Sequence, residues 1–235
     1  MKGQTMNRRF WFNSFAAWLL LTLGLAGAAH AAGSINGAWT LVGNGYLAMV
    51  QDSVSGSVVV VQVNPSFNSG TVYVGTRSGD AVAVQSLDRS STLNLAVNAG
   101  SFTGTQTVNA STSAVSGQLL FAYQGSATDG VWQKNGSTER YLMTLSLIAS
   151  NVPLMLLIDV GIDAATAGVS YDISTGTVAG VTPTYVGKSL TSTKTISLAF
   201  KGGNPATAAY SAVDGGRPPR LLEPFEATQI MKVAQ

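Results

Sequence analysis

The sequence contains no cysteine, and its single histidine, His30, lies near the N-terminus. Charged residues are also scarce, at 10% of 235 residues, whereas 46% of the residues are hydrophobic and 26 are glycine. A disordered tail, a coiled coil or a nucleic-acid-binding domain carries many more charges. The composition therefore indicates one folded domain or two small ones, with a core built from apolar side chains.

The first 31 residues have the order of a secretory signal peptide. Lys2, Arg8 and Arg9 precede an apolar run over residues 15–29, and Ala29-His30-Ala31 fits a small-residue cleavage site. The alternative is a retained membrane anchor, but the apolar run is short for a span of roughly 20 residues. We therefore expect residues 1–31 to be a signal peptide and the protein to be exported, to the periplasm, the cell surface or the medium.

Cleavage after Ala31 would remove the histidine and three of the thirteen Lys and Arg residues. Ten basic residues would then face eleven acidic ones, a net charge of −1. This balance gives no electrostatic reason to expect DNA, RNA or anionic lipid as a partner. Without histidine or cysteine, the mature chain lacks a Ser-His-Asp triad, a cysteine nucleophile and the usual zinc or copper ligands.

Most of the mature chain alternates apolar and polar residues with the period of a half-buried strand. Residues 58–61 form a continuous valine run, typical of a strand buried on both faces. Residues 109–117 are rich in Ser, Thr, Asn and Ala and predict a loop or a weak edge. Residues 141–150 and 154–160 predict two strands around a proline-containing turn, and residues 221–233 predict a last strand in preference to a short helix. The fold class is therefore all-β and antiparallel.

The sequence contains a candidate internal repeat. Gly37-Ala-Trp39 recurs as Gly130-Val-Trp132, and four later segments follow in the same order. The matched pairs are residues 46–50 with 141–145, 58–61 with 154–157, 72–84 with 169–181, and 93–97 with 196–200. We expect two tandem β-meander repeats, residues 32–125 and 126–235, each with five or six strands. Two such small sheets would share one core, either as a sandwich or as one closed up-and-down barrel.

Trp39 and Trp132 would occupy equivalent places in the two repeats. Large aromatic side chains usually serve packing, so each is first of all a candidate core residue. Each is also the candidate ligand-binding residue of its repeat, as a surface on which a sugar ring or an apolar ligand stacks. The Gly-x-Trp start resembles that of the calycins (lipocalins and avidins), whose first strand carries the same motif. It also resembles a loosely defined set of bacterial exported β-meander repeats, and neither resemblance identifies a ligand-lining residue here.

Carboxylates, lysines and tyrosines are the acid and base groups left to the mature chain. Asp159, Asp163 and Asp172 are close in sequence, but no spacing identifies the paired carboxylates that a glycosidase needs. The segment from Asp159 to Asp163 has acidic residues at the spacing of a calcium loop, yet Gly161 and Ala164 replace the residues that such a loop requires. Gly187-Lys188-Ser189 resembles the end of a phosphate-binding loop whose first glycine is replaced by Thr182. No catalytic residue, metal or cofactor is predicted.

These observations favour an exported, non-enzymatic β-rich protein that serves as a structural or adhesion-like module of the envelope or the extracellular space. Its partners would be envelope components or further copies of itself. The alternative is a binding protein for a small apolar or carbohydrate ligand, held in a barrel mouth or in a cleft between the repeats. An outer-membrane barrel and a carboxylate hydrolase are weaker alternatives, the first because many strands are shorter than the nine to eleven residues that a span needs.

Overall fold

The computed structural model describes residues 34–67, 69–149, 152–163, 165–166, 168–216 and 218–233. The predicted signal peptide lies outside these residues. Every element formed by the described residues is a β-strand, and all of their pairings are antiparallel. None of the described residues forms a helix that could cross a membrane. The all-β antiparallel fold predicted from the sequence is confirmed.

The first eight strands close on themselves. Each pairs with the next along the chain, and the first strand pairs with the eighth. The strands are β1 (Gly37–Leu41), β2 (Gly45–Gln51), β3 (Ser57–Val63), β4 (Gly70–Ser78), β5 (Ala81–Ser86), β6 (Ser91–Asn98), β7 (Ser101–Val108) and β8 (Ser111–Tyr123). These strands form an up-and-down barrel, called the first barrel below.

Eight of the remaining nine strands close in the same way. Pairing runs in order from β9 to β15, then from β15 to β17, and β17 pairs with β9. The two-residue strand β16 (Arg220–Leu221) pairs with β15 outside this cycle. The strands of this second barrel are β9 (Gly130–Lys134), β10 (Arg140–Ala149), β11 (Val152–Asp163), β12 (Gly168–Ala179), β13 (Thr184–Ser189), β14 (Lys194–Gly203), β15 (Ala206–Asp214) and β17 (Phe225–Lys232).

The structure thus selects barrels over a sandwich, but two small barrels in place of one large one. The prediction of five or six strands per repeat is wrong, because eight strands are present and eight suffice to close a barrel around packed side chains. The prediction of a loop over residues 109–117 is also wrong. Asn109 and Ala110 form a tight turn with positive φ, and β8 begins at once with Ser111. Its first residues look like a loop in sequence because their side chains face solvent.

Alternation of side chains builds both barrels. In β5, Val82 and Val84 are buried while Ala81 and Ala83 are exposed. β3 shows the predicted burial on both faces, since Val58 and Val60 belong to the apolar cluster inside the first barrel and Val61 to a cluster outside it.

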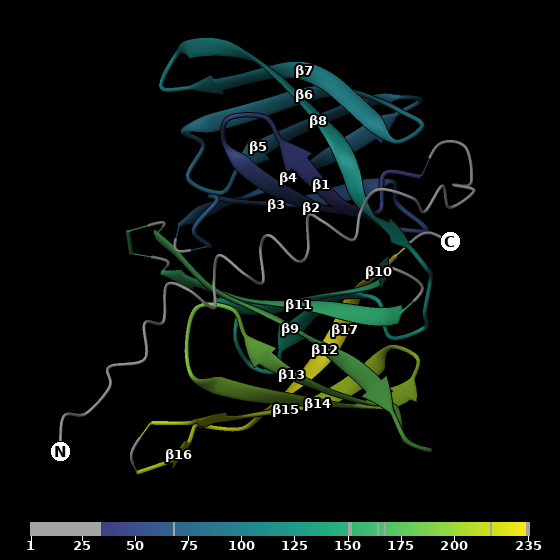
Figure 1. Ribbon diagram of the computed structural model, residues 1–235, viewed down its shortest axis with the longest axis vertical. Coiled ribbons are helices and arrows are strands. Elements are labelled where there is room, and N and C mark those ends of the chain that lie inside the picture. Colours follow the sequence, from purple (N-terminus) through teal and green to yellow (C-terminus); the bar gives the residue numbers. More distant parts are fainter. Residues whose placement is uncertain are drawn as a thin grey trace, which may run out of the picture.

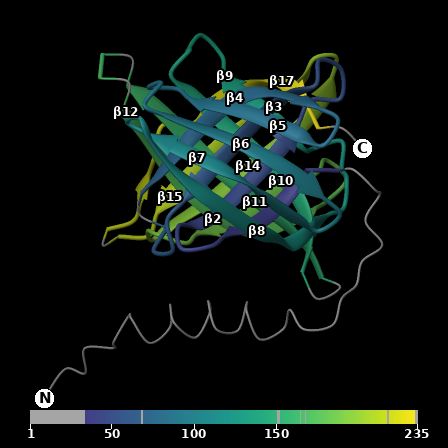
Figure 2. The same cartoon turned by 90° about the horizontal axis from the view of Figure 1, so that it is seen from above.

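In Figure 1 the first barrel lies above the second, and Figure 2 shows the same ribbon from above. Three apolar clusters hold the molecule together. One fills the first barrel, one fills the second, and one lies between the two barrels, where the outward faces of β2, β3 and β4 meet those of β10, β11 and β12. The last residues of β8 leave the first barrel and pair with β10, Ala122 opposite Ile148 and Tyr123 opposite Leu147. Each barrel therefore has an interior of its own. Two backbone pairings join the barrels, that of β8 with β10 and the isolated bridge between Asp52 and Val233.

Strand register defines which positions of the two barrels correspond. Trp39 lies opposite Leu47, and Trp132 lies opposite Leu142. Both closures also contain a bulge beside the tryptophan strand, with Leu120 as the extra residue in the first barrel and Ile230 in the second.

Register also changes two of the segment matches drawn from the sequence. Val58 corresponds to Met155, one residue later than the sequence match, and Gly75 corresponds to Gly176. Both glycines face the interior, where a Cβ atom would collide with the backbone of the next strand. A one-residue shift exchanges the two faces of a strand, and alternating sequences match almost equally well in either register.

Candidate functional site: an apolar cleft between the barrels

Trp39 and Trp132 both lie inside barrels, each 1% exposed. The ring of Trp39 packs against Phe102 with centroids 6.0 Å apart, and that of Trp132 against Phe200 at 5.3 Å. Both indole N–H groups donate hydrogen bonds inside the protein, at 3.0 and 2.9 Å. Interior packing accounts for both side chains, and their role in ligand binding stays a prediction.

Two of the candidate acid residues meet at one end of the second barrel. Asp159 and Asp172 are opposite one another on β11 and β12, each 7% exposed. Asp159 accepts hydrogen bonds from Arg140 at 2.6 and 3.0 Å and from Tyr210 at 2.9 Å. Asp172 accepts one from Lys194 at 2.8 Å. Each carboxylate is therefore paired with its own cation, an arrangement that fits a polar plug of the barrel end.

The ion pair governs the protonation of Arg140. Burial works to lower the pKa of Arg140, but the adjacent Asp159 carboxylate more than offsets it, so that the pKa is raised above its usual value. The guanidinium also lies over the rings of Tyr210 and Phe225, at 5.2 and 4.6 Å from their centroids. Packing against these two rings thus holds the charged guanidinium of Arg140 at the barrel end, against the Asp159 carboxylate.

The other sequence motifs lie in ordinary strand and turn positions. Asp163 ends β11, and its carboxylate accepts hydrogen bonds from Thr166 and from the backbone of Ala165, which lower its pKa. The candidate calcium segment is therefore a strand with Asp159 turned inward. Within the described ranges, no group of three His, Asp or Glu side chains is arranged to hold a metal. Gly187-Lys188-Ser189 lies on β13 and not in a loop.

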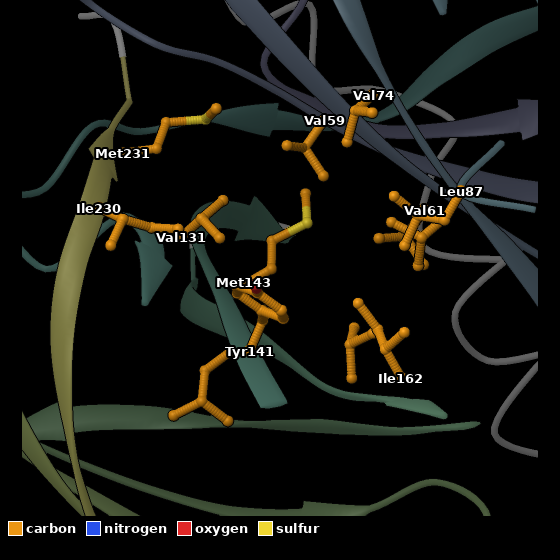
Figure 3. A pocket seen from close by; sticks show the side chains of 13 residues that line it. Val59, Val61, Val74, Leu87, Val131, Tyr141, Met143, Ile162, Ile230 and Met231 are labelled. Atoms are coloured by element: carbon orange, nitrogen blue, oxygen red, sulfur yellow. The ribbon is translucent and has the colours of Figure 1, made fainter. Parts of the chain in front are cut away.

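A cleft opens between the two barrels, beside the cluster that joins them (Figure 3). Its volume is about 300 Å³. The first barrel contributes outward-facing side chains of β3 and β4 and the residue after β5, which are Val59, Val61, Val72, Val74 and Leu87. The second barrel contributes residues of β9, β10, β11 and β17, which are Val131, Tyr141, Leu142, Met143, Val160, Ile162, Ile230 and Met231.

The cleft offers hydrocarbon contacts and almost nothing else. Tyr141 is the one lining residue with a polar side chain, and its hydroxyl donates to the carbonyl of Thr138 at 3.0 Å. Met143 and Met231 come from different strands and point into the same space in Figure 3. Thioether side chains are unbranched and adjust to irregular shapes. Val74 and Ile230 are 44% and 54% exposed, so apolar surface reaches the solvent at the edge of the cleft.

Two polar hollows adjoin the cleft. One, of about 330 Å³, shares Ile230 with it and is otherwise lined by residues 133–138 and Thr228. The second shares Ile162 with it and continues over the end of β11. Both hollows include Lys134 and Ser137, which flank the turn between β9 and β10. Polar residues therefore line the surface next to the cleft on this side.

The cleft was not predicted at the level of residues. The sequence pattern that points to the cleft is a run of consecutive apolar residues, which makes a strand apolar on both faces. Residues 58–61 and Tyr141-Leu142-Met143 have this pattern. Such a strand needs a covering on its outward side as well as on its inward side. The sequence does not say that the covering is a second barrel, nor that it leaves a gap.

Comparison with known proteins adds no assignment. No protein-family model matches the sequence, and neither the curated proteins nor the solved structures gave a match.

Proposed function

We propose that the protein is an exported, non-enzymatic binding protein for a small apolar molecule, held in the cleft between two barrels that are the two copies of a tandem repeat. The observation that carries the proposal is the concave, almost wholly apolar lining supplied by both barrels. Ligand sites typically have this character and lie between structural units. The corresponding tryptophans and bulges of the two barrels support the repeat.

Cleft volume limits the size of the ligand. A cavity of about 150 Å³ holds benzene, so a cleft of about 300 Å³ suits a hydrocarbon of roughly twelve carbon atoms. Each buried methylene contributes about 0.8 kcal/mol. Burial of about ten methylenes therefore corresponds to about 8 kcal/mol, the free energy of micromolar binding, without a hydrogen bond to the protein.

Assembly by strand addition, which the structural-module hypothesis would use, has less support. It needs a long strand edge with free backbone groups, whereas each barrel strand among the described residues is paired on both sides. The hydrolase alternative is also weakened, because Asp159 and Asp172 are each paired with a cation and are not among the residues that line the cleft.

Titration with dodecan-1-ol, followed by calorimetry, tests the proposal. We expect saturable binding of one molecule with a negative heat-capacity change. Val74→Trp places an indole ring at the cleft edge and should weaken binding at least tenfold, since displacing two methylenes already costs about 1.6 kcal/mol. Val186→Trp is the matched control, because Val186 is a similarly exposed strand valine away from the cleft. Absence of saturable binding, or equal affinity in Val74→Trp and the wild type, would contradict the proposal.

A further inference from the structure

The outward face of the second barrel changes from apolar to polar beside the cleft. On this face Val131 of β9 lies between Met231 of β17 and Met143 of β10, and all three line the cleft. Two residues further along β9, Gln133 lies opposite Thr228 of β17. Alternation puts this polar pair on the same face as the apolar row, roughly 7 Å away along the strand. Both polar residues line the hollow of about 330 Å³ that adjoins the cleft.

The charge of Lys134 lies on the opposite face of β9. Lys134 is the one charged residue among those that line this hollow, but alternation puts its side chain on the interior face, with Trp132. Its ammonium group lies 5.5 Å from the centre of the Phe225 ring, which belongs to the cluster inside the second barrel. The same group is 3.9 Å from the carboxylate of Glu223. A ligand in the hollow therefore meets neutral side chains.

The neutral side chains of the hollow leave hydrogen-bond donors and acceptors free. Gln133 donates through Nε2 to the carbonyl of Ser137 at 2.7 Å, and none of the described residues donates to its Oε1. The hydroxyl of Thr228 donates to Oδ1 of Asn135 at 2.7 Å, and none of the described residues accepts from Nδ2 of Asn135. A head group placed here can therefore both donate and accept hydrogen bonds, as a hydroxyl group does and an ionised carboxylate does not.

The hollow and the cleft adjoin, since Ile230 lines both. We infer that the ligand is an uncharged amphiphile whose single hydrocarbon chain occupies the cleft and whose hydroxyl-rich head binds Gln133, Asn135 and Thr228 in the hollow. This inference rests on the proposed function and adds to it the chemistry of the head group. A glycerol head and a sugar head share this chemistry, and the test distinguishes them.

The test uses calorimetry with four ligands of one chain length, below their micelle concentrations: 1-O-dodecylglycerol, dodecyl glucoside, dodecan-1-ol and dodecanoate. We expect at least one of the two hydroxyl-rich ligands to bind about five- to tenfold more tightly than dodecan-1-ol, and the tighter of the two identifies the head. This advantage should not change with salt, because the head and the side chains that bind it are neutral. Dodecanoate should bind no more tightly than dodecan-1-ol.

A double variant tests the residues of the hollow. Gln133→Leu combined with Thr228→Val replaces two polar side chains by apolar ones of similar size. The advantage of the hydroxyl-rich ligands should then be lost, while continued binding of dodecan-1-ol shows that the cleft is intact. Gln118→Leu is the matched control and should keep the advantage, because Gln118 is an exposed strand glutamine on β8, outside the cleft and the hollow.

The results that would overturn this inference differ from those that would overturn the proposed function. Equal affinities for dodecan-1-ol and both hydroxyl-rich ligands, an advantage that survives the double variant, or tightest binding of dodecanoate would overturn the inference and leave the cleft as the hydrocarbon site. Failure of all four ligands to bind would overturn both.

Discussion

Asn36 in the first barrel and Asp129 in the second occupy corresponding positions, three residues before Trp39 and Trp132. The side-chain oxygen of Asn36 accepts the backbone N–H of Gln51 at 2.7 Å, and that of Asp129 accepts the backbone N–H of Ser146 at 2.8 Å. Both residues are almost fully buried. The same hydrogen bond is thus made by a neutral amide in one barrel and by a carboxyl group in the other.

The barrel ends repeat this difference. Gln62 and Asp159 lie opposite the corresponding residues Leu47 and Leu142. Gln62 accepts hydrogen bonds from Tyr73 and Gln106 at 2.9 and 3.0 Å, all of them neutral groups. Asp159 is ion-paired.

Two barrels with the same strand arrangement can therefore close their interiors differently, one with amides and hydroxyls and the other with ion pairs. The choice decides how the barrel responds to its surroundings. Neutral groups respond little to pH or salt, whereas buried charges respond to both. The first barrel should accordingly be the less sensitive of the two.

The largest expected effect tests whether each tryptophan packs the interior of its own barrel. Trp39→Ala and Trp132→Ala should each lower the free energy of unfolding by about 3–5 kcal/mol, because each removes a fully buried ring from its own barrel. Urea denaturation followed by circular dichroism measures both. A loss below about 1 kcal/mol at either site, together with loss of ligand binding, would instead support the ligand role of that tryptophan.

Asp129 should make the second barrel pH-dependent. Burial raises the pKa of Asp129 to about 6 from its ordinary value of 3.8, and hydrogen bonds from Ser146 oppose this only in part. One carboxyl oxygen is buried without a hydrogen-bond partner, as is the hydroxyl of Tyr123. The folded state therefore favours the protonated form, so the stability from this group is complete below about pH 4 and is lost as the pH rises through 6. The loss amounts to about 3 kcal/mol.

Asp129→Asn gives the second barrel the amide found in the first. Relative to the wild type, this variant should gain stability between pH 4 and pH 7, as measured by urea denaturation at several pH values. Asn36→Asp is the reciprocal variant and should bring the same pH dependence into the first barrel. A wild-type-minus-variant difference that stays flat across this range would show that Asp129 does not titrate there.

The smallest of the three effects concerns the barrel ends. Asp159→Asn leaves the guanidinium of Arg140 without its carboxylate and should cost about 2 kcal/mol, less than for a fully buried pair because the Arg140 side chain is 34% exposed. Gln62→Asn is the matched change in the first barrel and should cost about 1 kcal/mol through lost hydrogen bonds. Urea denaturation at low and at high salt measures both effects. The stability difference between the wild type and Asp159→Asn should be smaller at high salt, whereas that between the wild type and Gln62→Asn should stay the same. An equal salt response at both sites would contradict the claim that an ion pair closes the second barrel and neutral groups close the first.

Alternation in the sequence predicted the strands well because it reports local burial directly, as at Val58 and Val60. It did not predict how the strands close. Residues 111–117 are half of a barrel strand, yet their polar side chains resemble a loop when their partners on β7 are unknown. Without β8, the first meander lacks the strand that closes it onto β1.

From the sequence, the candidate ligand site was either a barrel mouth or a cleft between the repeats, with Trp39 and Trp132 as its candidate residues, and the residues that line the cleft were not predicted. The lining residues depend on how two finished barrels pack, and that packing is long-range. Met143 and Met231 are 88 positions apart in the numbering and line the same cleft because β17 and β10 both pair with β9, where Val131 lies between them. The residue before each Gly-x-Trp motif carried information that the motif alone did not, since Asn36 and Asp129 make the same hydrogen bond.

The most direct test of the account is a crystal structure of the protein with 12-bromododecanoate, in which anomalous scattering locates the bromine atom. One strong peak is expected in the space between Met143 and Met231. A peak inside either barrel, beside Trp39 or Trp132, would contradict it and place the ligand where the two tryptophans lie.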